Sequence, residues 1–202
     1  MRLIPAIFRS VPAGILSGIS WAMPSWPCGG GRITTMDGQT HDVGKWDMLI
    51  AHPPCTYLSK AGGNRLRVNG EIQQERYEKG AAAKEFFLEF LNADCPRIAV
   101  ENPIPLKIFD LPPYSQIIQP YMFGDPWMKT TCLWLKGVPP LFATDVVVPE
   151  GKWVCSTDHR KQKVQDRWQT SGRRTQKERS KTFPGIARAM AEQWGGIVTA
   201  SH

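Results

Sequence analysis

The residue of this chain best suited to chemistry is a cysteine that follows two prolines at the end of an apolar run. Cys55 comes directly after Pro53-Pro54, and the run Trp46-Asp47-Met48-Leu49-Ile50 lies just before them. Each proline fixes its own φ and restricts the residue before it, so the turn holds the thiol in a set position. A thiolate is a nucleophile, and open α/β folds place ligands and chemistry at the carboxyl ends of their strands. The pattern predicts a cysteine nucleophile; the alternative is a loop cysteine without chemistry.

A second apolar run ends in an acid and an amide. Residues 97–100 lead directly into Glu101 and Asn102. A short apolar run of this kind is typical of a buried strand. We therefore expect a carboxylate and an amide to lie where this second strand ends.

The elements that must position these groups are two strands and the helix between them. Apolar residues recur at helical spacing from about Glu71 to Asn92, and Asn69 is the expected helix cap. A strand, a crossover helix and a second strand form a right-handed βαβ unit with two parallel neighbours. Cys55 and Glu101 should then emerge side by side at one edge of a sheet.

The ordered motifs resemble those of the DNA cytosine carbon-5 methyltransferases. That family carries a Pro-Pro-Cys loop after one strand and a Glu-Asn pair after the next, as Pro53-Pro54-Cys55 and Glu101-Asn102 do here. Residues 123–137 are similar to the family's hairpin with basic residues. More narrowly, the run from residue 46 to residue 194 resembles small phage-type methyltransferase-like proteins. The resemblance implies an α/β fold with a Rossmann-like methyltransferase sheet, and location in the cytoplasm of a bacterial host cell, with a phage or prophage origin.

The resemblance also implies a reaction and its residues. The protein would transfer a methyl group from S-adenosylmethionine to carbon-5 of cytosine in DNA, with the target base flipped out of the duplex. Cys55 would add to carbon-6 as a covalent nucleophile, and Glu101 would hydrogen-bond the ring nitrogen and the exocyclic amine. Asn102 would hold the Pro53-Pro54 loop or the base. The residues expected to contact the substrate are Pro53, Pro54, Thr56, Lys129, Thr130 and Thr131.

The N-terminal part of the chain departs from the family pattern. The family opens with a strand and a glycine loop that holds S-adenosylmethionine, and nothing equivalent is visible before Asp47. We expect the sheet to be incomplete or atypical at the N-terminus, with the first forty or so residues degenerate, truncated or read in an altered frame. The predicted divisions are an atypical segment at 1–45, a methyltransferase-like core at 46–150 and a basic segment at 151–202. No cofactor-binding residue is assigned.

The charge of the chain is concentrated near its C-terminus. Residues 151–202 contain 11 Lys and Arg against 4 Asp and Glu, a surplus of +7 that equals the net charge of the whole chain. Such a segment fits binding to a phosphate backbone, which makes DNA the expected partner. The alternative is a solvated basic loop.

Several other classes of function fit the sequence poorly. No apolar run reaches the length of a membrane span, so no membrane partner is expected. Five cysteines at irregular spacing indicate a reduced, cytosolic protein, and Cys155 with His159 lacks the further ligands of a zinc site. His52 stands where amino-methyltransferases need Asp or Asn. No metal is expected.

Two alternatives to the methyltransferase remain open. One is a catalytically inactive relic that still binds DNA. The other is a different thiolate-dependent pyrimidine-modifying enzyme, such as a thymidylate-synthase-like protein. Two structural expectations complete the analysis: an edge strand over residues 142–148 and an amphipathic helix over residues 186–194.

Overall fold

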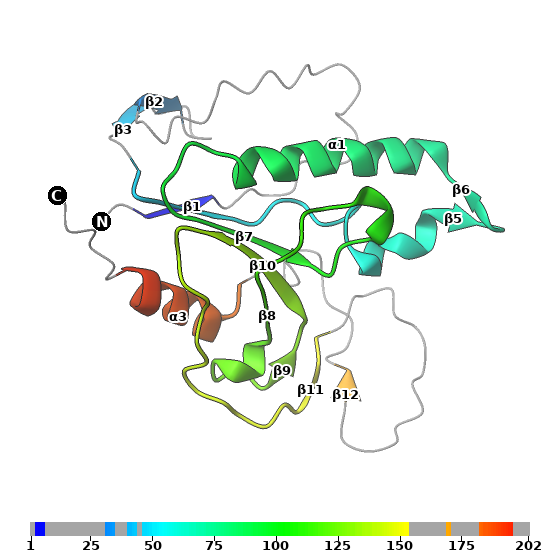
Figure 1. Cartoon of the computed structure of the whole chain (residues 1–202). Helices are drawn as coiled ribbons and strands as arrows, with labels where there is room; N and C mark the ends of the chain where they lie inside the picture. The colour runs from blue at the N-terminus through cyan, green and yellow to red at the C-terminus, as the bar shows by residue number, and fades with distance from the viewer. Residues whose placement is uncertain are drawn as a thin grey trace. The chain divides into compact units, whose positions relative to one another are not determined.

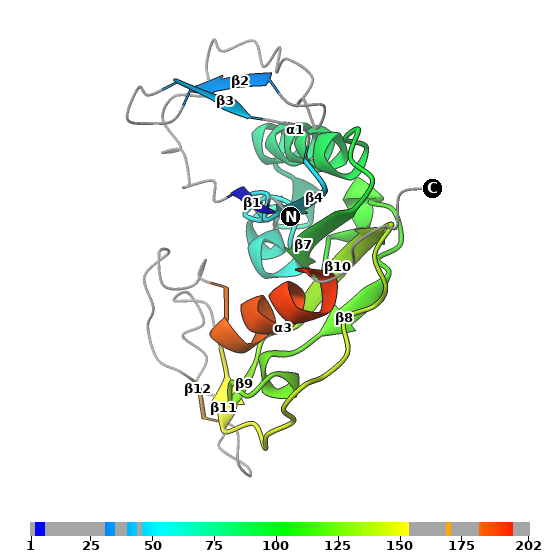
Figure 2. The ribbon, with the colours of Figure 1, turned by 90° about the vertical axis from the view of Figure 1, so that its left-hand side faces the viewer.

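The two predicted motif strands are parallel neighbours. β4 (Met48–Ala51) and β7 (Ile98–Pro103) pair with Ala51 opposite Val100, and α1 (Gln74–Leu91) connects them. Both views show α1 running along one face of these two strands (Figure 1, Figure 2). The predicted strand–helix–strand arrangement with parallel strands is confirmed.

The structure, a computed structural model, describes residues 3–6, 31–34, 40–43, 46–153, 169–170 and 182–195. It is a mixed α/β structure, and its largest sheet contains parallel and antiparallel strands in the order β1-β4-β7-β10-β8. Two compact units are distinguished, Met1–Tyr114 with Leu133–Val138, and Ser115–Cys132 with Pro139–His202. The division predicted at residues 45 and 150 stays a prediction.

The core of the first unit lies between α1 and the sheet. The Phe87 ring meets the Trp134 ring edge to face at 4.9 Å, where Trp134 comes from β10 (Thr131–Lys136). The Trp134 indole N–H donates to the carbonyl of Pro112 at 2.7 Å, which satisfies the polar end of a buried aromatic side chain. Gly80 of α1 lies against the Phe109 ring, in the short helix η2 (Lys107–Phe109). The helix is thereby held against β10 at one point and against η2 at another.

The expected start of the helix at residue 71 is wrong. A small antiparallel hairpin, β5 (Arg67–Val68) and β6 (Glu71–Ile72), occupies that part of the chain. Its turn residues Asn69 and Gly70 have φ values of +52° and +88°, the left-handed region that Asn and Gly tolerate in two-residue hairpin turns. Asn69 is therefore a turn residue and not the helix cap, and the capping position is Gln73.

The N-terminal region contains a strand that the sequence did not reveal. β1 (Leu3–Ala6) pairs in parallel with β4, with Leu3 opposite Met48. β2 (Gly31–Thr34) and β3 (Thr40–Val43) form an antiparallel pair. The sequence showed nothing equivalent to the family's opening strand and glycine loop before Asp47, and β1 is a strand in that region that went unrecognised, because four residues with a proline in the middle give too short a pattern.

The second unit combines short strands with one helix. Its elements are β8 (Gln116–Ile118), the short helix η3 (Pro120–Met122), β9 (Trp127–Met128), β11 (Gly151–Lys152), β12 (Gln169–Thr170) and α3 (Pro184–Gly195). β11 pairs in parallel with both β9 and β12. The predicted helix over 186–194 is confirmed, and it begins at a proline, whose fixed φ suits the first helical turn.

The predicted edge strand over residues 142–148 is wrong. The Gln193 side-chain amide bonds the backbone N–H and carbonyl of Phe142 at 2.8 and 2.7 Å, and Gln116 bonds both backbone groups of Leu141 in the same way. Farther along, Val147 N–H donates to the carbonyl of Tyr121 at 2.9 Å. These bonds to side chains and to a non-strand segment replace a strand ladder, so residues 142–148 form no strand.

Candidate active site

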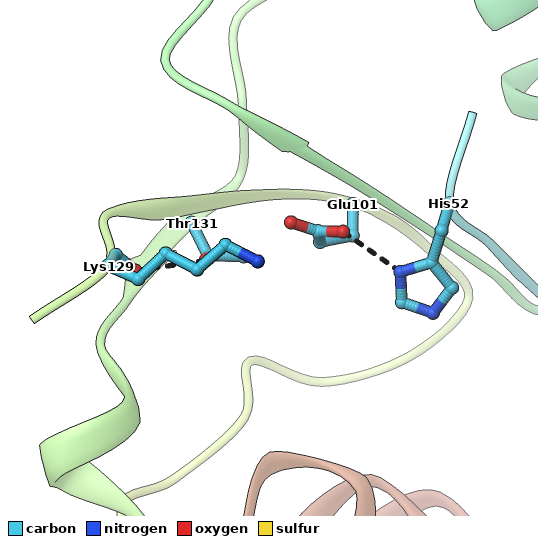
Figure 3. A network of polar contacts seen from close by, with 4 residues as sticks. All are labelled: His52, Glu101, Lys129 and Thr131. Atoms are coloured by element: carbon cyan, nitrogen blue, oxygen red, sulfur yellow. Dashed lines mark hydrogen bonds and ion pairs between the residues drawn. The ribbon is translucent and has the colours of Figure 1, made fainter. Parts of the chain in front are cut away.

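The parallel register of β4 and β7 brings His52 and Glu101 together. Each residue directly follows one member of the Ala51–Val100 pair. His52 Nδ1 lies 2.9 Å from Glu101 Oε2, with 29% and 19% of the two side chains exposed (Figure 3). A carboxylate and an imidazole therefore meet at this edge of the sheet. Residues 53–62, which carry Cys55 and which we call the thiol loop, begin at the same edge.

The thiol loop leaves this edge through the two prolines. Pro53 is buried, Pro54 is exposed and Cys55 is partly buried. The Ser59 N–H donates to the Cys55 carbonyl at 2.9 Å, which closes a turn around residues 56–58. The turn anchors the backbone at Cys55 directly, while its side chain retains access to solvent.

Backbone hydrogen bonds join the end of this loop to the segment after β7. The Lys60 N–H donates to the Ile104 carbonyl at 2.8 Å, and the Leu106 N–H donates to the Leu58 carbonyl at 2.7 Å. Ser59 pairs with Pro105 between these two bonds as an isolated antiparallel bridge. The loop that carries the thiol and the strand that carries Glu101 are thus one hydrogen-bonded assembly.

Arg76, in the first turn of α1, clamps the thiol loop from the helix side. Its guanidinium donates to the carbonyl of Gly62 at 2.9 Å and to that of Thr56 at 3.4 Å, and lies 4.9 Å from the centre of the Tyr57 ring. Gly62, in η1 (Lys60–Arg65), approaches so closely that an added Cβ would lie 2.1 Å from the Thr56 oxygen. The Arg76 guanidinium and the close contact between Gly62 and Thr56 therefore hold the backbone on both sides of the turn.

Asn102 is buried with an unsatisfied amide. Its side chain is 1% exposed, and neither its Oδ1 nor its Nδ2 has a hydrogen-bond partner among the described residues. The expected bond from this amide to the Pro53-Pro54 loop is therefore not made. Successive side chains of a strand point to opposite faces, so Asn102 and Glu101 leave β7 on different sides. Contact between Asn102 and a base stays a prediction.

The other predicted substrate residues lie in the second unit. The Thr131 hydroxyl donates to the Lys129 carbonyl at 3.0 Å, as Figure 3 shows, and the Gln119 side-chain amide donates to the Thr130 hydroxyl at 2.9 Å. The Lys129 ammonium lies 5.8 Å from the centre of the Phe183 ring. The two hydroxyls therefore shape the backbone around Lys129, whose charge is held over an aromatic face.

An aromatic cluster supports Lys129 from within the second unit. Trp153 contacts Trp127 and Phe183 edge to face, with ring centres 5.3 and 4.9 Å apart. The Gly185 N–H at the start of α3 donates to Asp125 Oδ2 at 3.0 Å. These contacts fix the helix start and β9 against each other within this unit, so Lys129 stands on a rigid base.

No cofactor or metal site can be assigned among the residues that the structure describes. The stretch that follows β1, where the family's glycine loop would stand, and Cys155 and His159 lie outside the described residues, as does most of the basic segment after Trp153. In the described ranges no three His, Cys, Asp or Glu side chains are grouped to hold a metal ion, and Cys55, Cys95 and Cys132 form no disulfide. No helix within those ranges is long and apolar enough to cross a bilayer.

Sequence reasoning missed two residues of this site. His52 was weighed only against a different class of methyltransferase, although its place directly after the strand was a usable signal. Arg76 carried no local signal, because its contacts are with residues 14 to 20 positions earlier in the chain. Comparisons with protein-family models, with curated proteins and with solved structures find no match to this chain.

Proposed function

We propose that this protein is a DNA cytosine-5 methyltransferase-like enzyme that works through a covalent Cys55 adduct. The observation that carries the proposal is the joined edge of β4 and β7, where the Cys55 loop and the Glu101 strand are held together by backbone hydrogen bonds. A nucleophile and a carboxyl group fixed to one another are what addition to a pyrimidine ring requires. The three parallel neighbours β1, β4 and β7 fit a Rossmann-like methyltransferase sheet.

The chemistry assigned to Cys55 begins with its thiolate. The sulfur forms a bond to carbon-6 of cytosine, and the electrons of the carbon-5–carbon-6 double bond shift toward carbon-5 and the ring nitrogen. S-adenosylmethionine, when bound, supplies the electrophilic methyl group that carbon-5 then attacks. Loss of the carbon-5 proton restores the double bond and releases the thiolate. Ser59 anchors the backbone of Cys55 and Arg76 that of the adjacent Thr56, which serves this step by fixing where the sulfur starts.

Glu101 suits the other side of the base. A carboxyl group can accept from the exocyclic amine of cytosine and share a proton with the ring nitrogen, whose basicity rises as the sulfur adds. Uracil and thymine present a carbonyl where cytosine presents the amine, so a Glu101 oxygen that accepts from this amine favours cytosine. The donor is assigned no residues, since the segment after β1 lies outside the described ranges.

DNA is the proposed substrate because of the charge distribution. The surplus of +7 in residues 151–202 would provide contacts to phosphates, and Lys129 a further cation. The reaction also requires the base to leave the duplex, which costs least in single strands and mismatches. A cytoplasmic role in a bacterial host cell is part of the same proposal.

Covalent trapping tests the proposal. DNA that contains 5-fluorocytosine at random positions is incubated with the protein and S-adenosylmethionine, and denaturing gels report stable adducts. Fluorine at carbon-5 cannot leave as a proton does, so the adduct should persist after methyl transfer. We expect an adduct with the wild type and with Cys95→Ser, and none with Cys55→Ser. Equal trapping by Cys55→Ser and the wild type would exclude the proposed nucleophile.

A second assay separates addition from methyl transfer. Thiolate addition alone lets carbon-5 exchange its hydrogen with water, so tritium should leave [5-³H]cytosine DNA even without the donor. Exchange without methylation would indicate a thiolate enzyme that lacks donor binding, and exchange on free nucleotides alone would favour a nucleotide-modifying enzyme. Neither exchange nor an adduct would leave only a DNA-binding relic and overturn the proposal.

A further inference from the structure

We propose that His52 is a positioning residue for Glu101, holding its carboxylate in a fixed orientation for the substrate. The inference deepens the proposed function and rests on it. It is carried by the 2.9 Å contact between His52 Nδ1 and Glu101 Oε2 (Figure 3). An ionised carboxylate can only accept, so the contact places a proton on Nδ1.

The backbone around His52 is built to hold the imidazole in place. His52 directly follows β4, whose register against β7 fixes the spacing between the two chains at Ala51 and Val100. It also directly precedes Pro53, which disfavours the helical region for its backbone. The imidazole therefore leaves a backbone that is restrained from both sides, and its reach to Glu101 follows from the strand pairing.

The bond has a consequence for the carboxylate. A glutamate side chain rotates about three bonds, and immobilising it costs conformational entropy. Because His52 holds Oε2, the Glu101 side chain has already lost this conformational entropy in the folded protein before the substrate binds. The carboxylate then has a defined orientation in which to accept from the exocyclic amine of cytosine. Partial burial of both side chains strengthens the bond, since less water competes for it.

The inference can be tested first without turnover. Imidazole ¹⁵N spectra of the wild type at neutral pH should show His52 with its proton on Nδ1. In Glu101→Gln, whose amide offers a weaker neutral acceptor, this preference should fall. An Nδ1 that carries no proton in the wild type would overturn the inference, whether or not the protein modifies DNA.

Kinetics provide the second test. His52→Ala should slow tritium release about 10- to 100-fold, the range for a lost hydrogen bond to a charged group, with KM for DNA changed less than about 2-fold. His52→Asn should recover most of the rate, because its amide N–H can donate from nearly the position of Nδ1. In Glu101→Gln, adding His52→Ala should cost little more. Equal rates for His52→Ala and the wild type, or no recovery in His52→Asn, would overturn the positioning role.

The two levels of the proposal fail differently. A wild type that neither exchanges nor traps DNA overturns both the function and the role that rests on it. A wild type that reacts, together with a His52→Ala variant that reacts as fast, overturns the role of His52 alone. Thermal unfolding of both variants, with midpoints near that of the wild type, assigns the rate loss to the site.

Discussion

Removing the Arg76 side chain should release the thiol loop without unfolding the protein. The guanidinium bonds the Gly62 carbonyl at 2.9 Å and the Thr56 carbonyl at 3.4 Å, and it contacts the Tyr57 ring. A hydrogen bond from a charged donor contributes about 1.5–3 kcal/mol, and the contact at 3.4 Å contributes at the low end or below. A partly exposed cation–π contact adds about 0.5–1 kcal/mol. Because one of the two hydrogen bonds is exposed and the other only partly buried, we take the lower part of the summed range and expect Arg76→Ala to lower the free energy of loop opening by about 2–3 kcal/mol.

Hydrogen exchange measures this opening directly. The Ser59 and Gly62 amides are bonded within the loop, to the carbonyls of Cys55 and Ser59. A loss of about 2–3 kcal/mol should speed their exchange about 30- to 150-fold. Arg76→Lys keeps one point charge but not the fork, so we expect an intermediate acceleration, near 10-fold.

The matched control is Lys79→Ala, on the same helix and of the same charge. Lys79 pairs with Glu75 at 2.5 Å, away from the loop carbonyls, so its removal should leave loop exchange unchanged. The Leu49 amide, bonded to the Arg97 carbonyl in the sheet, serves as an internal reference. Equal loop exchange in the Arg76 and Lys79 variants would refute the clamp. An equal acceleration at Leu49 would show global destabilisation instead.

Two further predictions concern the same part of the first unit. Gly62→Ala would place a Cβ 2.1 Å from the Thr56 oxygen, so we expect the free energy of unfolding in urea to fall by about 1–3 kcal/mol and adduct trapping to weaken. The control is Gly195→Ala, where nothing lies within 4 Å of an added Cβ and no steric loss is expected. A wild-type unfolding midpoint for Gly62→Ala would contradict the close packing. The hydrogen bond and charge of Lys79 hold the pKa of Glu75 below its usual 4.5. The pair therefore stabilises the fold at pH values above the unfolded pKa, and this contribution is lost as the pH falls through the lowered pKa. An NMR titration of Lys79→Ala should find the Glu75 pKa back at its usual value, and an unchanged pKa would count against the pair.

The shared edge of the sheet could be predicted because its causes are local. The runs that became β4 and β7 consist of buried apolar residues, and the helical spacing between them leaves little choice but a crossover. Parallel pairing then follows from topology alone, and it brings the residues after the two strands together. The place of the Cys55 loop beside the Glu101 strand is of this kind.

The contacts that complete the site depend on register and on distant partners. His52 meets Glu101 only because Ala51 pairs with Val100, and a register shifted by one residue would turn the two side chains to opposite faces. The strand prediction for residues 142–148 failed because the local sequence cannot show that the Gln116 and Gln193 amides take the backbone bonds of Leu141 and Phe142. Such pairings are decided by tertiary structure.

The backbone hydrogen bonds between the thiol loop and the segment after β7 also determine when the loop can be completed during synthesis. The Leu58 carbonyl can accept its hydrogen bond only after Leu106, which is 48 residues farther along the chain, has been made. At a synthesis rate of about 5–20 residues per second, Cys55 is made about 2–10 seconds before the segment that completes its loop. During that interval the thiol is held by local contacts alone. The Cys55 loop therefore reaches its final conformation only after β7 and the segment behind it have been made, when the hydrogen bonds to residues 104 and 106 can form.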